Sequence, residues 1–184
     1  TTRHIYLEPV ARNTAAAIAV AAFAVARENP AGILVVMPSD HVIREETRFV
    51  EAVRRAAKVA ATGRLVLFGI KPSEPHTGYG YIRQGSALEG FNGGAFKVDA
   101  FFEKPDATTA KSYLTAGNFF WNSGIFVLGA RSFLEELQRL EPRIYDAARA
   151  AFNGAKEDLG FIRLDKKAFA QSPNISIDYA VMEK

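Results

Sequence analysis

Short apolar runs alternate along the chain with amphipathic stretches. The runs predict strands at residues 4–7, 33–37, 65–70, 81–83, 96–102 and 119–128. The amphipathic stretches predict helices at about 13–28, 47–61, 106–115, 131–140, 143–152, 166–170 and 178–184. The first five elements therefore read strand, helix, strand, helix, strand, which predicts a parallel sheet with right-handed crossovers.

Residues at the ends of these segments refine the prediction. The continuous apolar run at 33–37 is typical of a central strand covered on both faces. Asn13 or Thr14 is expected to cap the first helix, and Asp106 to cap the helix that follows it. Residues 92–94, Asn-Gly-Gly, predict a hairpin-type turn.

Composition narrows the class of protein. The 184 residues predict a single domain, 1–184, and 48% apolar with 23% charged residues is ordinary for a globular chain. Cys is absent, which excludes disulfides and thiolate chemistry and agrees with a cytoplasmic location. No apolar run reaches the ~18 residues of a membrane span. The net charge is +3 with acidic and basic residues interleaved, so we expect neither membrane nor nucleic acid as a partner.

Four polar clusters fall at or near predicted strand ends, where α/β sheets bind ligands. The first runs from Glu8 to Thr14, where Glu8 could accept hydrogen bonds from a guanine edge, or could simply be a surface residue before a helix. The second is Ser39-Asp40-His41. Asp40 suits Mg²⁺, which takes only one or two protein carboxylates, whereas His41 is expected to be structural.

The other two clusters suit a sugar phosphate. Residues 77–81, Thr-Gly-Tyr-Gly-Tyr, combine glycines that allow close approach with tyrosines that can pack on a sugar ring. Glu103 and Asn122 can hydrogen-bond to hydroxyl groups, and Lys104 can neutralise a phosphate. Taken singly, each of these could also be an ordinary turn or a surface charge pair.

Seven segments in this order resemble the mannose-1-phosphate guanylyltransferase family, also called GDP-mannose pyrophosphorylases. They are Glu8-Pro9-x-x-Arg12-Asn13-Thr14-Ala15, Met37 to His41, Phe68-Gly69-Ile70, Thr77 to Ile82, Phe102 to Pro105, Trp121 to Phe126 and Ser176 to Lys184. The nearest match is the bacterial form that is often fused to a phosphomannose isomerase domain. The resemblance covers nearly the whole chain.

The resemblance implies an α/β nucleotide-diphospho-sugar transferase fold, a Rossmann-like three-layer sandwich with a mixed, mostly parallel sheet. It implies the partners GTP and mannose 1-phosphate, and Mg²⁺ as cofactor. By this resemblance Asp40 holds the metal and, with Lys104, is catalytic. The implied nucleotide-binding residues are Glu8, Arg12, Asn13, Thr14, Pro38, Ser39 and Asp40, and the implied sugar-phosphate residues are Gly78, Tyr79, Glu103, Lys104, Asn122, Ser123 and Lys184. Asp178 and Glu183 match a motif near the active site without an assigned role.

Two family segments lie outside this sequence. They are an N-terminal Gly-Gly-x-Gly-x-Arg-Leu segment and a Trp-x-Asp-Val-Gly segment with a second metal aspartate. We therefore expect an internal fragment, truncated at both ends and nearly inactive alone, with an exposed sheet edge through which copies could associate. The alternatives are a non-catalytic nucleotide- or sugar-binding module, a glucose-1-phosphate enzyme using UTP or dTTP, and a metal-dependent glycosyltransferase. The last is disfavoured because the Asp-x-Asp pair is absent from the 39–41 segment.

Overall fold

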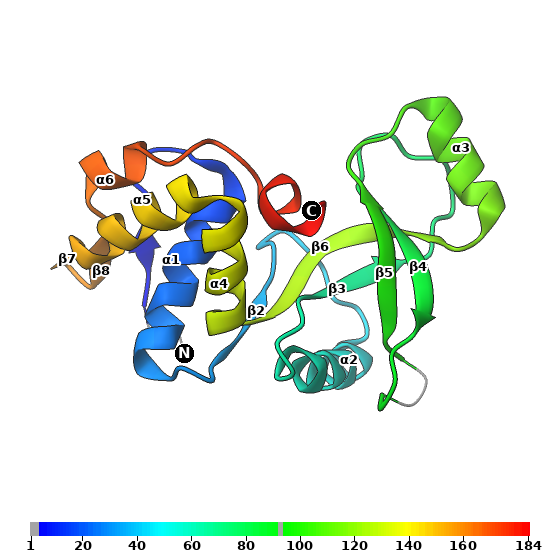
Figure 1. Cartoon of the computed structure of the whole chain (residues 1–184), viewed down its shortest axis with the longest axis horizontal. Helices are drawn as coiled ribbons and strands as arrows, with labels where there is room; N and C mark the ends of the chain where they lie inside the picture. Colours follow the sequence, from blue (N-terminus) through cyan, green and yellow to red (C-terminus); the bar gives the residue numbers. More distant parts are fainter. Residues whose placement is uncertain (1–3, 92–93) are drawn as a thin grey trace. The chain divides into compact units, whose positions relative to one another are not determined.

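The computed structural model describes residues 4–91 and 94–184 (Figure 1). The chain forms two compact units. Among the described residues, unit 1 comprises 4–34, 130–182 and 184, and unit 2 comprises 35–91, 94–129 and 183. The two units are defined by how compactly their residues pack, which does not test whether the chain is one domain. The single domain 1–184 therefore stays a prediction.

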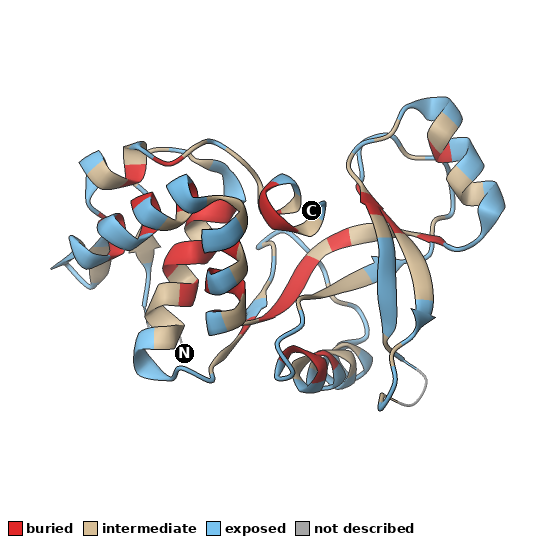
Figure 2. Cartoon of the chain, viewed as in Figure 1, coloured by how far each residue is buried: buried red, intermediate tan, exposed pale blue. Residues whose placement is uncertain are grey.

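Unit 1 is built mainly of helices. They are α1 (Asn13–Glu28), α4 (Ala130–Leu140), α5 (Pro142–Asn153), α6 (Lys166–Ala170) and the short π-helix η1 (Asp178–Met182) (Figure 1). Helix α1 packs against α4 and α5, and its buried face (Figure 2) consists largely of alanines, including Ala15, Ala16, Ala19 and Ala22, whose small side chains let the helices approach closely. At the other end of α1, the Arg27 guanidinium lies 4.8 Å from the ring centroid of Phe152.

A small sheet of three strands completes unit 1. Its order is β1 (Tyr6–Leu7), β8 (Phe161–Arg163), β7 (Lys156–Asp158), with β1 parallel to β8 and β7 antiparallel to it. β7 and β8 were not predicted, because a strand of only three residues is too short to show an alternating apolar pattern, and β7 consists of charged residues alone.

The larger sheet has five strands. They are β2 (Ile33–Val36), which runs from unit 1 into unit 2, and β3 (Val66–Ile70), β4 (Tyr81–Ala87), β5 (Phe96–Phe102) and β6 (Phe119–Gly129) of unit 2 (Figure 1). The order is β2-β6-β4-β5, and β3 also pairs with β6. Helices α2 (Glu46–Ala60) and α3 (Ala107–Ala116) belong to the same unit.

The α/β class is confirmed, but two details of the predicted sheet are wrong. The pairings of β3 with β6, β4 with β6 and β4 with β5 are antiparallel, and β1 belongs to the small sheet. The strand order β1, β2, β3 therefore does not form one parallel sheet. Crossover helices are compatible with both arrangements, so the order of elements alone could not choose between them.

The strand at 33–37 is also not central. β2 stands at the end of the strand order, and Val35 and Met37 are each 42% exposed. The central strand is β6, whose residues 125–128, Ile-Phe-Val-Leu, are all buried (Figure 2). A continuous apolar run therefore predicted burial correctly in β6 but incorrectly in β2.

Most helix boundaries are confirmed, including the start of α1 at residue 13, but the predicted cap of α1 is wrong. Asp106 caps α3 as expected, since its Oδ1 accepts a hydrogen bond from the Thr109 N–H at 2.8 Å. No side chain caps α1 in this way. Asn13 lies within its first turn with φ 59°, and Thr14 bonds elsewhere in unit 1. The predicted final helix is confined to η1, and Asn92 and Gly93 of the predicted turn lie outside the described residues.

Candidate active site

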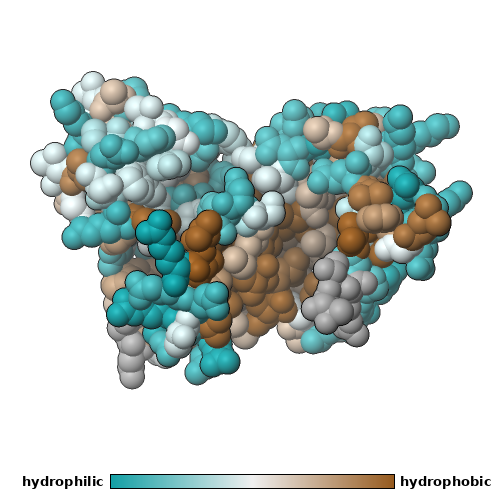
Figure 3. All heavy atoms as spheres, turned by 180° about the vertical axis from the view of Figure 1, so that it is seen from behind, coloured by the Kyte–Doolittle hydropathy of each residue, from teal (hydrophilic) through white to brown (hydrophobic). Residues whose placement is uncertain are grey.

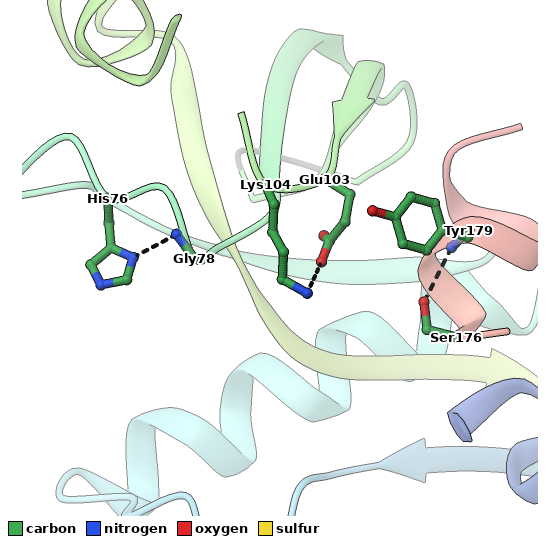
Figure 4. Close-up of polar contacts among 6 residues, drawn as sticks. All are labelled: His76, Gly78, Glu103, Lys104, Ser176 and Tyr179. Atoms are coloured by element: carbon green, nitrogen blue, oxygen red, sulfur yellow. Dashed lines mark hydrogen bonds and ion pairs between the residues drawn. The ribbon is translucent and has the colours of Figure 1, made fainter. Parts of the chain in front are cut away.

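A nearly buried carboxylate in unit 2 is the centre of the candidate sugar-phosphate site. The Glu103 side chain is only 11% exposed, and its Oε1 lies 3.3 Å from the Lys104 Nζ, whose side chain is 60% exposed (Figure 4). Gly80 and Asn122 adjoin this pair. A Cβ atom added at Gly80 would lie 2.6 Å from Glu103 Oε2 and 3.4 Å from the Asn122 Cβ. Gly80, Glu103, Lys104 and Asn122 are called the Glu103 cluster below.

Local structure explains why these residues meet. The Asn122 N–H donates to the Gly80 carbonyl at 2.7 Å, which ties β6 to the residue just before β4. Glu103 follows directly after β5, the antiparallel neighbour of β4, so the end of β5 lies beside the start of β4. Lys104 has φ 47°, a left-handed conformation that a non-glycine residue seldom adopts and that is common at functional sites.

An aromatic group lies on the loop that enters β4. The Tyr79 ring stacks on His76 with centroids 4.0 Å apart, and its other contact is an edge contact with Trp121 at 5.2 Å. Trp121 and Asn122 are consecutive residues of β6, so their side chains point to opposite faces of the sheet, and the ring group packs on the Trp121 side. The structure thus places Glu103, Lys104 and Asn122 of the predicted sugar-phosphate residues around Gly80, and it places Gly78 and Tyr79 on the loop that leads into Gly80.

The loop after β2 approaches the same strand. A Cβ at Gly124 would be 3.7 Å from the Pro38 ring, and the Gly124 N–H donates to Asn122 Oδ1 at 3.2 Å. Ser39 and Asp40 follow Pro38 in an exposed turn. Ser123 is buried instead, and its Oγ accepts from the Ile125 N–H at 3.2 Å.

The predicted nucleotide-binding residues of unit 1 lie at the start of α1. Arg12 donates from Nε and Nη2 to the Ala170 carbonyl, at 3.2 and 2.8 Å. Thr14 Oγ1 accepts from the Ile177 N–H at 2.9 Å, and Asn13 Oδ1 accepts from the Thr14 N–H. These bonds fasten the start of α1 to the chain around residues 170–177.

Glu8 and Lys184 are the remaining predicted residues, and both belong to unit 1. Glu8 is exposed, yet partial desolvation of its carboxyl group raises its pKa above the ordinary value. Lys184 Nζ forms an ion pair with Glu141 Oε1 at 2.5 Å, at the start of α5. Its predicted role with the sugar phosphate stays a prediction.

The predicted magnesium site at Asp40 stays a prediction. In the part of the chain that the structure describes, no group of three or more His, Asp or Glu side chains is placed to hold a metal. The exposed Asp40 supplies one carboxylate, and Mg²⁺ commonly takes one or two together with phosphate oxygens and water.

None of the described helices is long and apolar enough to cross a membrane.

Comparison with known proteins identifies the family of the chain. Residues 2–167 match the family described as Nucleotidyl transferase. The chain belongs to this nucleotidyl transferase family. It is 54% identical over 180 residues to the xanthan biosynthesis protein XanB of Xanthomonas campestris pv. campestris (strain B100), covering 98% of this chain and 38% of that protein.

Other members of the nucleotidyl transferase family give the same result. A mannose-1-phosphate guanylyltransferase of Escherichia coli (strain K12) is 47% identical over 186 residues, covering 100% of this chain and 39% of that protein. The chain thus spans less than half the length of these relatives. Among solved structures, a Helicobacter pylori protein described as a mannose-6-phosphate isomerase matches with TM-score 0.86 and 32% identity, over 98% of this chain and 68% of that one.

A second solved structure confirms the transferase fold. A Thermus thermophilus protein, described as a mannose-1-phosphate geranyltransferase, matches with TM-score 0.80 and 32% identity, over 97% of this chain and 49% of that one. The predicted nucleotidyltransferase fold is therefore confirmed.

Two residues near the candidate site, His76 and Trp121, were not predicted from the sequence. His76 Nδ1 accepts from the Gly78 N–H at 3.0 Å, and the Trp121 indole Nε1 is buried without a hydrogen-bond partner. The His76 bond could have been suspected from the sequence, because a polar residue stands two positions before a loop glycine. The burial of the Trp121 indole could not, because it depends on how β3, β4 and β6 pair.

Proposed function

We propose that this chain carries the nucleotidyl-transfer site of a mannose-1-phosphate guanylyltransferase, which joins GTP and mannose 1-phosphate to give GDP-mannose and diphosphate. The names of several close relatives support this reaction. The single observation that carries the proposal is the Glu103 cluster, where a nearly buried carboxylate and an exposed ammonium group lie side by side.

The proposed reaction is a direct displacement. A phosphate oxygen of mannose 1-phosphate attacks the α-phosphorus of GTP, a new P–O bond forms, and the bond from the α-phosphorus to the bridging oxygen of the β-phosphate breaks. Diphosphate leaves, and no covalent enzyme intermediate is needed. Catalysis then comes from positioning the reactants and from neutralising charge on the phosphates.

In this proposal the Glu103 cluster binds the sugar phosphate. The Glu103 carboxylate accepts hydrogen bonds from sugar hydroxyls, and the Asn122 amide can both donate and accept. Lys104 places a positive charge for the phosphate, and its 60% exposed side chain is accessible to a ligand. Tyr79, which is 45% exposed, offers ring surface to the hexose.

The proposed nucleotide-binding residues come from two segments of the chain. Glu8 accepts hydrogen bonds from the guanine edge, while Arg12 and Thr14 support that segment through their bonds to residues 170 and 177. Asp40 would hold Mg²⁺, which when bound with the triphosphate screens its negative charge and orients it. Pro38 and Ser39 place Asp40 after β2.

A binding experiment on this chain tests the sugar-phosphate half. Trp121 is the only tryptophan and contacts Tyr79, so its fluorescence reports on the site. We expect mannose 1-phosphate to bind, and Lys104→Gln to weaken binding roughly tenfold because a charge-assisted contact to phosphate is lost. Lys111→Gln on α3 removes the same charge elsewhere in unit 2 and serves as the matched control. Wild-type affinity in Lys104→Gln would contradict the proposal.

A second experiment tests base selection. Calorimetric titration with GTP, ATP and UTP in the presence of Mg²⁺ is expected to show a preference for GTP that Glu8→Gln reduces, because glutamine replaces one acceptor with a donor. Preference for UTP would favour a glucose-1-phosphate enzyme. Binding of GTP and mannose 1-phosphate without diphosphate release, in a protein of the relatives' length, would favour a non-catalytic module.

Three broader expectations belong to the same proposal. The GDP-mannose made would serve polysaccharide synthesis, as the name of the xanthan biosynthesis relative suggests. A cytoplasmic location agrees with the absence of Cys. Association of copies through a sheet edge is supported by the apolar side chains exposed on the terminal strands β2 and β5.

A further inference from the structure

His76 holds the loop that enters β4 through its side chain. Its Nδ1 accepts a hydrogen bond from the Gly78 N–H at 3.0 Å, as Figure 4 shows. An accepting Nδ1 in a neutral imidazole places the ring proton on Nε2. Gly78 permits this arrangement, because a Cβ there would lie 2.9 Å from the His76 Cε1 and 3.2 Å from Nδ1.

The same ring fixes the orientation of Tyr79. The two rings lie 4.0 Å apart and nearly parallel, at 14°, while Trp121 meets both of them nearly edge-on, at 6.4 Å from His76 and 5.2 Å from Tyr79. One face of the Tyr79 ring is thus covered by His76, and the residue remains 45% exposed.

The backbone of His76 is fastened as well. Its carbonyl oxygen accepts from Tyr81 Oη at 2.9 Å, and its N–H donates to the Glu74 carbonyl at 3.1 Å. Tyr81 is fully buried in the cluster with Ala110 and Phe119. A half-buried histidine therefore connects the core of unit 2 to the exposed residues 77–79.

We propose that His76 is a positioning residue for the sugar-phosphate site, which presents Gly78 and Tyr79 to the hexose in a preformed arrangement. This inference rests on the proposed function of the Glu103 cluster. His76 uses the Gly78 N–H, so that N–H is not a donor for the ligand, and Gly78 contributes close approach instead. A loop ordered before binding does not have to be ordered by the ligand, which improves affinity.

Three substitutions separate the two contacts of the ring. His76→Asn places an acceptor oxygen near the position of Nδ1 but cannot stack. His76→Phe stacks on Tyr79 but cannot accept. His76→Ala does neither. We expect His76→Ala to weaken mannose 1-phosphate binding roughly 2- to 10-fold, the range for ordering one or two side chains, and the other two variants to lie between it and wild type.

Nuclear magnetic resonance on the unliganded chain measures the His76–Gly78 hydrogen bond directly, which a general loss of stability would not change. The His76 ring ¹⁵N shifts should show the Nε2–H tautomer, and the Gly78 amide proton should carry a hydrogen-bonded shift. His76→Asn should retain that amide shift, whereas His76→Phe and His76→Ala should lose it. The single indole resonance of Trp121 shows in each case whether the fold is intact.

Each outcome decides something. The inference is overturned if the Gly78 amide shift is unchanged in His76→Ala, or if that variant loses the shift and still binds mannose 1-phosphate as wild type does. If wild type itself does not bind mannose 1-phosphate, the proposed function fails and the ligand-positioning role fails with it. The amide shifts then still decide whether His76 holds the loop.

Discussion

Glu8 carries a carboxyl group whose ionised form is disfavoured by the surrounding residues. Desolvation raises its pKa above the ordinary value of 4.5. A carboxyl group with this shift binds its proton more tightly in the folded than in the unfolded chain. It therefore lowers the free energy of unfolding as the pH rises from 4.5 through the raised pKa. A group that costs stability at neutral pH is a reasonable candidate for ligand recognition.

Glu8→Gln tests this cost. We expect the variant to be at least as stable as wild type at pH 7, because the desolvated charge is gone, and the difference to shrink as the pH falls below 4.5, where both forms are neutral. Urea unfolding between pH 3 and 8 measures it. Exposed Glu135 serves as a control site, where substitution by Gln should show no such rise in stability towards pH 7. A wild type that is more stable than Glu8→Gln at pH 7 would contradict the prediction.

Gly80 allows the Glu103 carboxylate to lie where it does. Gly80→Ala adds a Cβ only 2.6 Å from Glu103 Oε2 and 3.2 Å from the Phe101 ring, so the carboxylate must move. We expect mannose 1-phosphate affinity to fall roughly 10- to 100-fold, as for the loss of a charge-assisted hydrogen bond.

Trp121 fluorescence titration checks this expectation. Gly94→Ala is the matched control, since its Cβ would find its nearest neighbour, Arg55 Nε, at 3.8 Å. Equal affinities in the two alanine variants would show that the Glu103 position does not matter for the ligand.

Helix α3 is specified at both ends by single residues. Asp106 caps its start, and Gly117 ends it with φ 74°, a left-handed conformation that glycine adopts without strain. Its Tyr113 packs on the Phe119 ring, with centroids 4.0 Å apart, and so covers part of the sheet of unit 2.

The cap of α3 predicts a pH dependence. Hydrogen bonds from the Thr109 backbone and side chain lower the pKa of Asp106 below its ordinary 3.8. Its stabilising contribution is therefore present above pH 3.8 and is lost as the pH falls through the lowered pKa. Asp106→Ala should be less stable than wild type at pH 7. Asp106→Asn, which keeps an acceptor, should lose less, and its deficit should vanish in acid. Thermal unfolding from pH 7 to pH 2 measures both, and a deficit that persists unchanged in acid would refute the role of the charge.

At the scale of the whole molecule, the ends of the larger sheet expose apolar side chains. Figure 3 shows apolar side chains at the surface. The exposed ones on the terminal strands include Val35 of β2 and Phe96 and Val98 of β5, and Met37 follows β2 directly. A terminal strand presents unpaired backbone groups that a second copy can use.

The exposed terminal strands predict that copies of the chain associate, and that one charge placed on such a strand reduces this association. Val98→Lys should lower the fraction of dimer or higher species in sedimentation velocity at high protein concentration, because it places a charge on the β5 edge. Gln138 is exposed on α4 of unit 1, so Gln138→Lys adds the same charge away from the sheet and should leave the fraction of dimer unchanged. A wild type that sediments as a monomer over the whole concentration range would refute the prediction.

The sequence by itself determined the helices, most strands and the family. Periodic apolar positions and caps are local, so α2, α3 and α5 could be predicted within a few residues. The motifs also named Glu103, Lys104 and Asn122, which surround Gly80 in unit 2.

Only the tertiary structure decided which strands pair and what each polar group contacts. An apolar run indicates a strand but does not name its neighbours. The run in β2 therefore could not be distinguished from the central run in β6, and the antiparallel pairing of β3 with β6 could not be predicted. Arg12 bonds to Ala170 and Thr14 to Ile177, which are 158 and 163 positions further along the chain, and the His76 ring lies 6.4 Å from the Trp121 ring. Such contacts depend on how distant segments pack, which no local pattern in the sequence encodes.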